Sequence, residues 1–114
     1  MLIIGANEVL CGALLIDWDL IPLQFALLQN YPNPFNPMTN IRYEITEDIF
    51  VSITVYDLLG KVVNNLINTN QSSGYKSVQW NATNNQGQPV SAGMYIYTIQ
   101  AGEFRSTKKM VLLK

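Results

Sequence analysis

The chain has 114 residues, of which 48% are hydrophobic and 13% charged, and its net charge is −1 at pH 7. This length suits one domain with one core, and the charge balance excludes the basic face that nucleic-acid binding requires. Histidine is absent and cysteine occurs once, at Cys11, which excludes histidine-dependent triads, cysteine–histidine pairs and the usual zinc sites. One cysteine cannot form an internal disulfide, so cysteine usage leaves the cellular compartment open.

The N-terminal part differs in composition from the rest of the chain. Residues 1–16 are mostly apolar, but they lack the Lys or Arg that begins a signal peptide and contain Asn7 and Glu8. The run is shorter than the roughly 20 apolar residues that span a bilayer, so no transmembrane segment is expected. Composition shifts near Ile21–Pro22. We therefore expect residues 1–24 to be a leader or the remnant of an upstream region, and residues 25–114 to form the domain.

A proline-rich segment opens this domain. Its prolines fix φ and remove backbone donors, so neither a helix nor a central strand can pass through it. Residues that precede proline favour extended geometry. The sequence therefore predicts a rigid, extended and turned segment, anchored to the core by Tyr31 and Phe35. The segment consists of Tyr31, Pro32, Asn33, Pro34, Phe35, Asn36 and Pro37.

From Asn40 onward, apolar and polar residues alternate with a period of two, which is typical of strands with one buried face. Turn signals recur about every 8–12 residues and no helical period appears, a pattern that predicts an all-β, Ig-like antiparallel sandwich of about seven short strands. Gly60 is expected to adopt a positive φ in a turn. The expected strands are 41–45, 51–56, 61–67, 75–81, 94–100 and 104–113, with polar loops at 68–74 and 81–88 and a hairpin turn at 101–103.

Six blocks of the sequence carry a resemblance to a known family. They are 28–37 with Thr39, Ile41 and Tyr43, then 55–63, 74–75 with 78–81, 87–90, 91–97 and 108–114. In this order and spacing they resemble the type A C-terminal sorting domain of the type IX (Por) secretion system, over about three-quarters of the chain. One block alone would be a weak signal. The structural positions that the resemblance marks are Asp57, Gly60, Trp80, Gly87, Gly93, Tyr95 and Tyr97.

The resemblance implies an Ig-like sandwich at the extreme C-terminus of exported proteins. It implies recognition by an outer-membrane translocon and processing by a sortase-like peptidase that attaches the cargo to the cell surface. A related Ig-like module occurs in the flagellar hook-cap protein, which keeps an assembly role open. Two features depart from the family pattern. No large cargo domain precedes the motif, so we expect this chain to be a fragment, a truncated reading frame or an excised domain. The loop after Trp80 carries asparagines in place of acidic residues.

The C-terminal segment combines basic and apolar residues. One interpretation is an edge strand that its lysines protect against aggregation. The other, which the resemblance favours, is that the translocon recognises this strand by strand addition or by charge. The candidate recognition residues are Lys108, Lys109, Met110, Val111, Leu112, Leu113 and Lys114.

Other candidate sites have plainer explanations. The 81–87 loop has the spacing of a calcium loop but no carboxylate, and asparagine also suits turns. Asn70 and Asn81 each begin a glycosylation-like triplet, which polar loops also explain. The acidic residues around Glu47 are expected to be solvated, and Asp57 is expected to bond turn amides. We therefore predict no catalytic residue, no metal and no cofactor.

The function predicted from the sequence is a non-enzymatic sorting signal that directs an attached cargo through the periplasm to the cell surface. Its predicted partners are the translocon and the sortase-like peptidase. An adhesive Ig-like module that binds glycan or a partner protein is the alternative, and exposed rows of Tyr75, Trp80, Tyr95 and Tyr97 would favour it. A carboxylate hydrolase would need two carboxylates in one pocket. Cargo identity, cleavage and oligomeric state stay open.

Overall fold

The structure is a computed structural model that describes residues 21–113, and this part of the chain contains strands and no helix. The predictions for residues 1–20 and for Lys114 lie outside the described residues. Seven strands form two antiparallel sheets, which confirms the predicted β-sandwich. The strands are β2 (Ala26–Leu27), β3 (Thr39–Ile45), β4 (Ile49–Tyr56), β5 (Val62–Gln71), β6 (Gly74–Trp80), β7 (Gly93–Ala101) and β8 (Phe104–Leu112).

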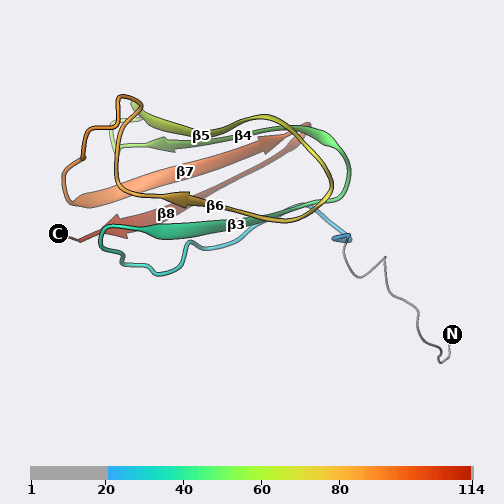
Figure 1. Ribbon diagram of the computed structural model, residues 1–114, viewed down its shortest axis with the longest axis horizontal. Helices are drawn as coiled ribbons and strands as arrows, with labels where there is room; N and C mark the ends of the chain where they lie inside the picture. Colours follow the sequence, from blue (N-terminus) through green and yellow to red (C-terminus); the bar gives the residue numbers. More distant parts are fainter. Residues whose placement is uncertain (1–20, 114) are drawn as a thin grey trace, which may run out of the picture.

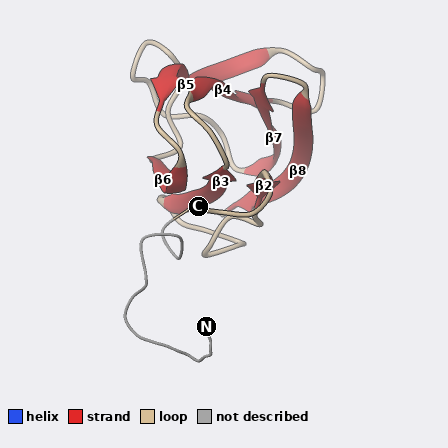
Figure 2. Ribbon diagram, turned by 90° about the vertical axis from the view of Figure 1, so that its right-hand side faces the viewer, coloured by secondary structure: helices blue, strands red, loops and turns tan. Residues whose placement is uncertain are grey.

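The two sheets are unequal in size. One has the order β2-β3-β6 and the other the order β5-β4-β7-β8, and every pairing is antiparallel. Figure 1 shows the sheets lying over one another with their strands roughly aligned, and Figure 2 looks along them. At one end of the sandwich β4, β6 and β8 finish and β3, β5 and β7 begin, and the chain leaves the fold there (Figure 1). We call this the C-terminal end and the opposite one the distal end.

The core follows the predicted period of two. Every second residue of β3, β4 and β7 points into the space between the sheets, because successive side chains of a strand face opposite sides. The central β4 shows this clearly: Val51, Ile53 and Val55 are fully buried, while the residues between them are partly exposed. The largest buried side chains are Trp80, Tyr43, Tyr97, Phe35, Ile41, Ile45, Ile53, Ile99, Met110 and Leu112.

The prediction for the third strand was wrong at its end. The sequence placed its end at Ile67 and a polar loop over 68–74, but β5 continues to Gln71 and pairs with β4 as far as Ile49. These polar residues stay in the strand because β4 supplies backbone partners along its full length, and because the strand lies at a sheet edge where its side chains reach solvent. Two register shifts in this pairing mark β-bulges. The short β2 was also not predicted.

Candidate recognition surface

The predicted recognition segment lies at the edge of the four-stranded sheet, because β8 pairs with β7 on one side only. Its residues divide by the period of two. Met110 and Leu112 are 0% and 1% exposed and belong to the core, whereas Lys109 and Leu113 are exposed. Val111 is half-buried. Only part of this segment is therefore accessible to a partner while the domain stays folded.

The proline-rich segment covers the outer edge of β8. Phe35 forms a parallel bridge to Leu112: its N–H donates to the carbonyl of Val111 at 3.0 Å, and its carbonyl accepts from Leu113 N at 2.8 Å. Asn33 Oδ1 accepts from Val111 N at 3.0 Å. The structure thus joins the beginning and the end of the domain, which the sequence had suggested as two separate functional segments. Strand addition along this part of β8 requires that the proline-rich segment move away.

Gln29 extends this cover toward the middle of β8. Its side-chain Nε2 donates to the carbonyl of Lys109 at 2.7 Å. The edge from Lys109 to Leu113 is therefore occupied by this protein's own atoms, in addition to any protection that the lysines give. Sequence reasoning missed this role because nothing near Gln29 in the chain indicates a partner 80 residues away.

A buried polar network holds the proline-rich segment in place. The hydroxyl of Tyr97 accepts from Asn30 N at 2.7 Å and donates to the carbonyl of Leu28 at 2.8 Å. Asn30 Nδ2 donates to Thr39 Oγ1 at 2.9 Å, and Thr39 Oγ1 donates to the carbonyl of Pro32 at 2.9 Å. Burial raises the pKa of Tyr97 to about 12, because the phenolate would lose its hydration there. This hydrogen-bonded network fixes the position of the chain where it enters the proline-rich segment.

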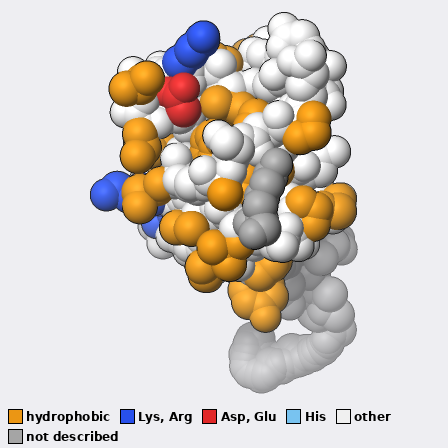
Figure 3. All heavy atoms as spheres, turned by 90° about the vertical axis from the view of Figure 1, so that its left-hand side faces the viewer, with side chains coloured by type: hydrophobic (Ala, Val, Ile, Leu, Met, Phe, Trp, Pro, Cys, Tyr) orange, Lys and Arg blue, Asp and Glu red, His pale blue; other side chains and the backbone are white. Residues whose placement is uncertain are grey.

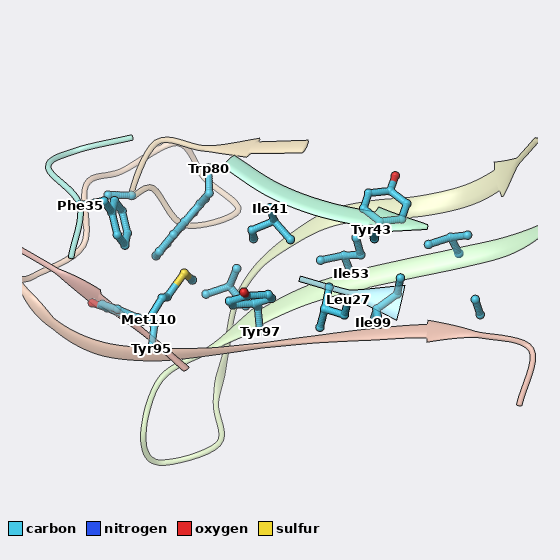
Figure 4. Packing of buried hydrophobic residues seen from close by; sticks show 14 of the residues in the cluster. Leu27, Phe35, Ile41, Tyr43, Ile53, Trp80, Tyr95, Tyr97, Ile99 and Met110 are labelled. Atoms are coloured by element: carbon cyan, nitrogen blue, oxygen red, sulfur yellow. The ribbon is translucent and has the colours of Figure 1, made fainter. Parts of the chain in front are cut away.

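The two predicted aromatic anchors behave differently. Phe35 is 1% exposed and packs against Trp80, with ring centroids 5.7 Å apart, as predicted. Trp80 in turn meets Tyr95 edge-on at 5.4 Å, and Figure 4 shows these rings together with Met110 at one end of the core. Tyr31 is 73% exposed, so its prediction as an anchor was wrong. Its backbone, not its ring, holds it, through a bridge to Asn40.

The predictions for Asp57 and Gly60 in the turn between β4 and β5 are confirmed, because nearby residues in the chain determine the geometry of such a turn. Asp57 Oδ1 accepts from Leu59 N at 2.9 Å and from Lys61 N at 3.0 Å, as expected. Gly60 has a φ of +85°, also as expected. Gly87 has a φ of +80° and closes the asparagine-rich loop by donating to the carbonyl of Asn84 at 2.9 Å.

That loop uses its side-chain amide oxygens for hydrogen bonds within itself and to β5, where Asn85 Oδ1 accepts from Asn65 N at 3.0 Å. Asn84 Oδ1 accepts from Gln86 N at 3.0 Å and from Gln88 N at 2.9 Å, while Asn81 Oδ1 accepts from Thr83 Oγ1 at 2.6 Å. Among residues 21–113, no group of three or more His, Cys, Asp or Glu side chains is placed to hold a metal ion. The loop's oxygens are thus occupied as turn residues commonly are.

Two surface hollows contain one carboxylate each. A hollow of about 340 Å³ on the outer face of β3 and β6 is lined by Glu44, Arg42 and Tyr75 among others. A second one, beside the start of β4, contains Asp48, whose Oδ1 accepts from Ser73 N at 3.0 Å. Neither hollow brings two carboxylates together, the arrangement that acid–base hydrolysis requires.

In the described part of the chain no helix has the length and hydrophobicity to cross a membrane. Among solved structures, the chain is similar to dimeric latent PorU from Porphyromonas gingivalis, with a TM-score of 0.61 and 20% identity. It is also similar to PorZ of the same organism, an essential bacterial surface component of the type IX secretion system, with a TM-score of 0.54 and 20% identity. The matches cover 76% and 75% of this chain but only 9% and 11% of those chains, and at this identity they show the fold alone.

A comparison with curated proteins found no match. The sequence profile described as the secretion system C-terminal sorting domain matches residues 29–113. The match begins two residues before the proline-rich segment and ends at Leu113, so it includes both segments that meet at β8. This family is non-catalytic, its role implies contact with the secretion machinery, and its cargo proteins are exported to the cell surface or the extracellular space. The chain belongs to the secretion system C-terminal sorting domains, the signals that direct an attached cargo protein through the type IX secretion system.

Proposed function

We propose that this domain is recognised by the outer-membrane translocon of the type IX system through its C-terminal end, with Lys108–Lys114 as the recognised segment. The observation that supports this most directly is the bridge between Phe35 and Leu112. It fixes the last strand at one defined end of a folded sandwich, so the accessible residues of that strand have a fixed geometry. Preorganisation of this kind favours binding because less conformational freedom is lost.

The accessible part of the segment has the chemistry for charge-assisted recognition. Lys109 in β8 and Leu113 directly after it are exposed, whereas Met110 and Leu112 are held in the core. An exposed basic side chain and an exposed apolar one along the same extended segment suit a partner surface that carries acidic groups around an apolar contact. We therefore assign recognition to Lys109 and Leu113 and a supporting role to Met110 and Leu112.

The proposal also covers the domain boundaries, the export route of the cargo and its processing. Residues 25–114 act as the sorting domain, residues 1–24 are a leader or the remnant of an upstream region, and the attached cargo passes through the periplasm before it reaches the translocon. A sortase-like peptidase then processes the cargo, and the domain itself performs no catalysis. Membership in a non-catalytic family supports the last point.

The test fuses the full 114-residue chain behind an exported reporter in a host that has the type IX system, and measures reporter on the cell surface. Deleting residues 108–114 is a poor variant, because it removes the buried Met110 and Leu112. Lys109→Glu is better, and Arg105→Glu is its matched control: both residues are exposed on β8, and the change in charge is identical. We expect display to require the translocon and to fall for Lys109→Glu but not for Arg105→Glu.

Two results would contradict the proposal. Display that persists in a host without the translocon removes the sorting role for this chain in that host. Equal display of the Lys109→Glu and Arg105→Glu fusions removes the role of the C-terminal segment. The mass of the displayed reporter, with or without residues 25–114, tests the peptidase separately.

The adhesive alternative loses its main support. Trp80, Tyr95 and Tyr97 are 1%, 6% and 0% exposed, so they form core and not a row of exposed rings. Of the four aromatic residues considered for sugar stacking, Tyr75 is exposed, at 59%. A single ring beside the Arg42 and Glu44 hollow does not provide the exposed row of aromatic residues that motivated this alternative.

A further inference from the structure

The turn between β4 and β5 presents two leucines on a rigid support. Leu58 and Leu59 are 61% and 94% exposed. The turn beneath them is closed by the backbone, where Asp57 N donates to the carbonyl of Lys61 and Gly60 N donates to that of Asp57, both at 3.0 Å. It is closed again by the Asp57 carboxylate, which accepts from the amides of Leu59 and Lys61. The leucines are thus held in solvent by four hydrogen bonds.

This turn needs no leucine for its own geometry. Turns favour Gly, Asn, Asp, Ser and Pro for conformational reasons, and Asp57 and Gly60 already meet those needs. The leucines also contribute little to the core, because most of their surface stays in water. Isolated exposed leucines are ordinary on protein surfaces, so the neighbourhood of the turn decides whether these have a role.

Exposed apolar side chains collect at the same end of the sandwich. Of the eleven large hydrophobic residues that are exposed in the described chain, seven belong to the C-terminal end. Figure 3 faces this end and shows apolar side chains spread over much of it. Apolar side chains that gather at one end in this way mark an interaction site more often than residues scattered over the whole surface do. The seven are Tyr31, Met38, Leu58, Leu59, Val62, Met94 and Leu113.

Charge is distributed unequally between the two ends. Of the five acidic residues in the described chain, Asp57 alone lies at the C-terminal end, and its Oδ1 is already engaged by turn amides. The others lie in or beside turns at the distal end. Lys61 and Lys109 are exposed at the C-terminal end. The end that carries these apolar side chains therefore also carries exposed positive charge. The four distal acidic residues are Glu44, Glu47, Asp48 and Glu103.

We infer that Leu58 and Leu59 insert into an apolar pocket with an acidic rim on a protein of the secretion machinery, next to the contact made by β8. This inference rests on the proposed function and adds a second contact to it. Apolar anchors surrounded by complementary charge are the usual composition of a protein interface. Acidic lipid surfaces are read by clusters of about four to eight basic residues, which this end lacks among the described residues.

The experiment uses the same reporter fusion of the full chain. The variant Leu58→Asn/Leu59→Asn removes both anchors, and Leu23→Asn/Phe50→Asn is the matched control, since those side chains are 97% and 49% exposed at the distal end. Thermal unfolding of the purified chains checks that each double variant folds. We expect surface display of the first variant to fall about tenfold or more, as for interface hot spots, and that of the control to stay within about twofold.

The outcomes separate this inference from the proposed function. If the unmodified fusion is displayed and the Leu58→Asn/Leu59→Asn fusion is displayed equally well, the docking role is wrong and the sorting role stands. If the unmodified fusion is not displayed, the proposed function fails and the docking role fails with it. A photo-crosslinker in place of Leu59 identifies the neighbour: crosslinking to an outer-membrane protein of the type IX machinery supports the inference. Crosslinking to a second copy of this chain, to lipid or to nothing overturns it.

Discussion

Replacing Tyr97 by phenylalanine removes one oxygen atom from the network that positions the proline-rich segment. The ring is fully buried, and its hydroxyl is bonded to Asn30 N at 2.7 Å and to the carbonyl of Leu28 at 2.8 Å. A buried group that loses its partner costs about 1–3 kcal/mol. Asn30 is 2% exposed, so its N–H has no access to water, whereas Leu28 is half-buried and its carbonyl can regain part of its hydration. We expect Tyr97→Phe to lower the free energy of unfolding by about 2 kcal/mol.

Urea unfolding of the purified 114-residue chain measures this change, with an unchanged m-value as the sign that the folded state is intact. Two other tyrosines calibrate it. Tyr95 donates to the carbonyl of the exposed Ser91 at 2.6 Å, so Tyr95→Phe should cost less than about 1 kcal/mol. Tyr75 is 59% exposed, and Tyr75→Phe should cost almost nothing. The reasoning is refuted if Tyr97→Phe destabilises the domain no more than Tyr75→Phe does.

The same hydroxyl gives the stability a dependence on pH. Because burial raises the pKa of Tyr97 from 10.0 to about 12, the folded state binds the phenol proton more tightly than the unfolded chain does. This stabilisation is complete below pH 10 and is lost as pH rises through 12, and at about 1.4 kcal/mol per pKa unit it amounts to a few kcal/mol. The difference in unfolding free energy between the unmodified chain and Tyr97→Phe should therefore decrease as the pH rises above 10. If the unfolding free energies of the two proteins change in parallel from pH 8 to pH 12, the raised pKa of Tyr97 is wrong. Burial also raises the pKa of Tyr43, so some decline persists in Tyr97→Phe.

Three further predictions follow from other contacts. Phe35→Ala should lower the free energy of unfolding by about 3–5 kcal/mol because it empties a buried aromatic site. Tyr31→Ala should change the same free energy by less than about 0.5 kcal/mol. Equal effects of the two variants would show that Tyr31 is an anchor after all. Gly60→Ala and Gly102→Ala should each lower the urea midpoint, because both residues have a positive φ that side chains rarely adopt. The added Cβ at Gly102 lies 2.7 Å from Ile49 Cδ1 but displaces only the end of a flexible side chain, and the added Cβ at Gly60 meets nothing within 4 Å. An unchanged midpoint for either variant would contradict this. Asn33→Ala should speed hydrogen exchange of the Val111 amide, which it bonds at 3.0 Å, without altering the exchange of core amides; unchanged exchange at Val111 would count against that bond.

Local chemistry explains which parts of this fold could be predicted from the sequence. The alternation in 51–56 predicted the buried face of β4, and Asp57 with Gly60 predicted its turn, because each signal depends on neighbours in the chain. The end of β5 could not be predicted in this way. Its residues 68–71 are polar and resemble a loop, and only their pairing with β4 keeps them in the strand.

The candidate surface was harder to predict for the same reason. Tyr31 and Phe35 are both aromatic residues among prolines, and nothing local distinguishes the exposed ring from the buried one. The distinction comes from β8, which bonds the backbone of Phe35 and lies about 77 residues further along the chain. Asn30 was noted within a family block, but its buried hydrogen bonds to Thr39 and Tyr97 depend on the same long-range packing.

The pairing of the two segments limits how the signal can be recognised. If the translocon bound β8 by adding a strand next to Val111, it would first have to displace Phe35, whose ring is 1% exposed and packs on Trp80. That displacement would cost about as much as the loss of a buried aromatic side chain, several kcal/mol of a total stability of about 5–15 kcal/mol. Recognition of side chains on the intact C-terminal end carries no such cost. The geometry therefore favours a signal that is read as a folded surface, in which the basic C-terminal residues and the Leu58–Leu59 turn are presented together, over one that is read as an extended tail.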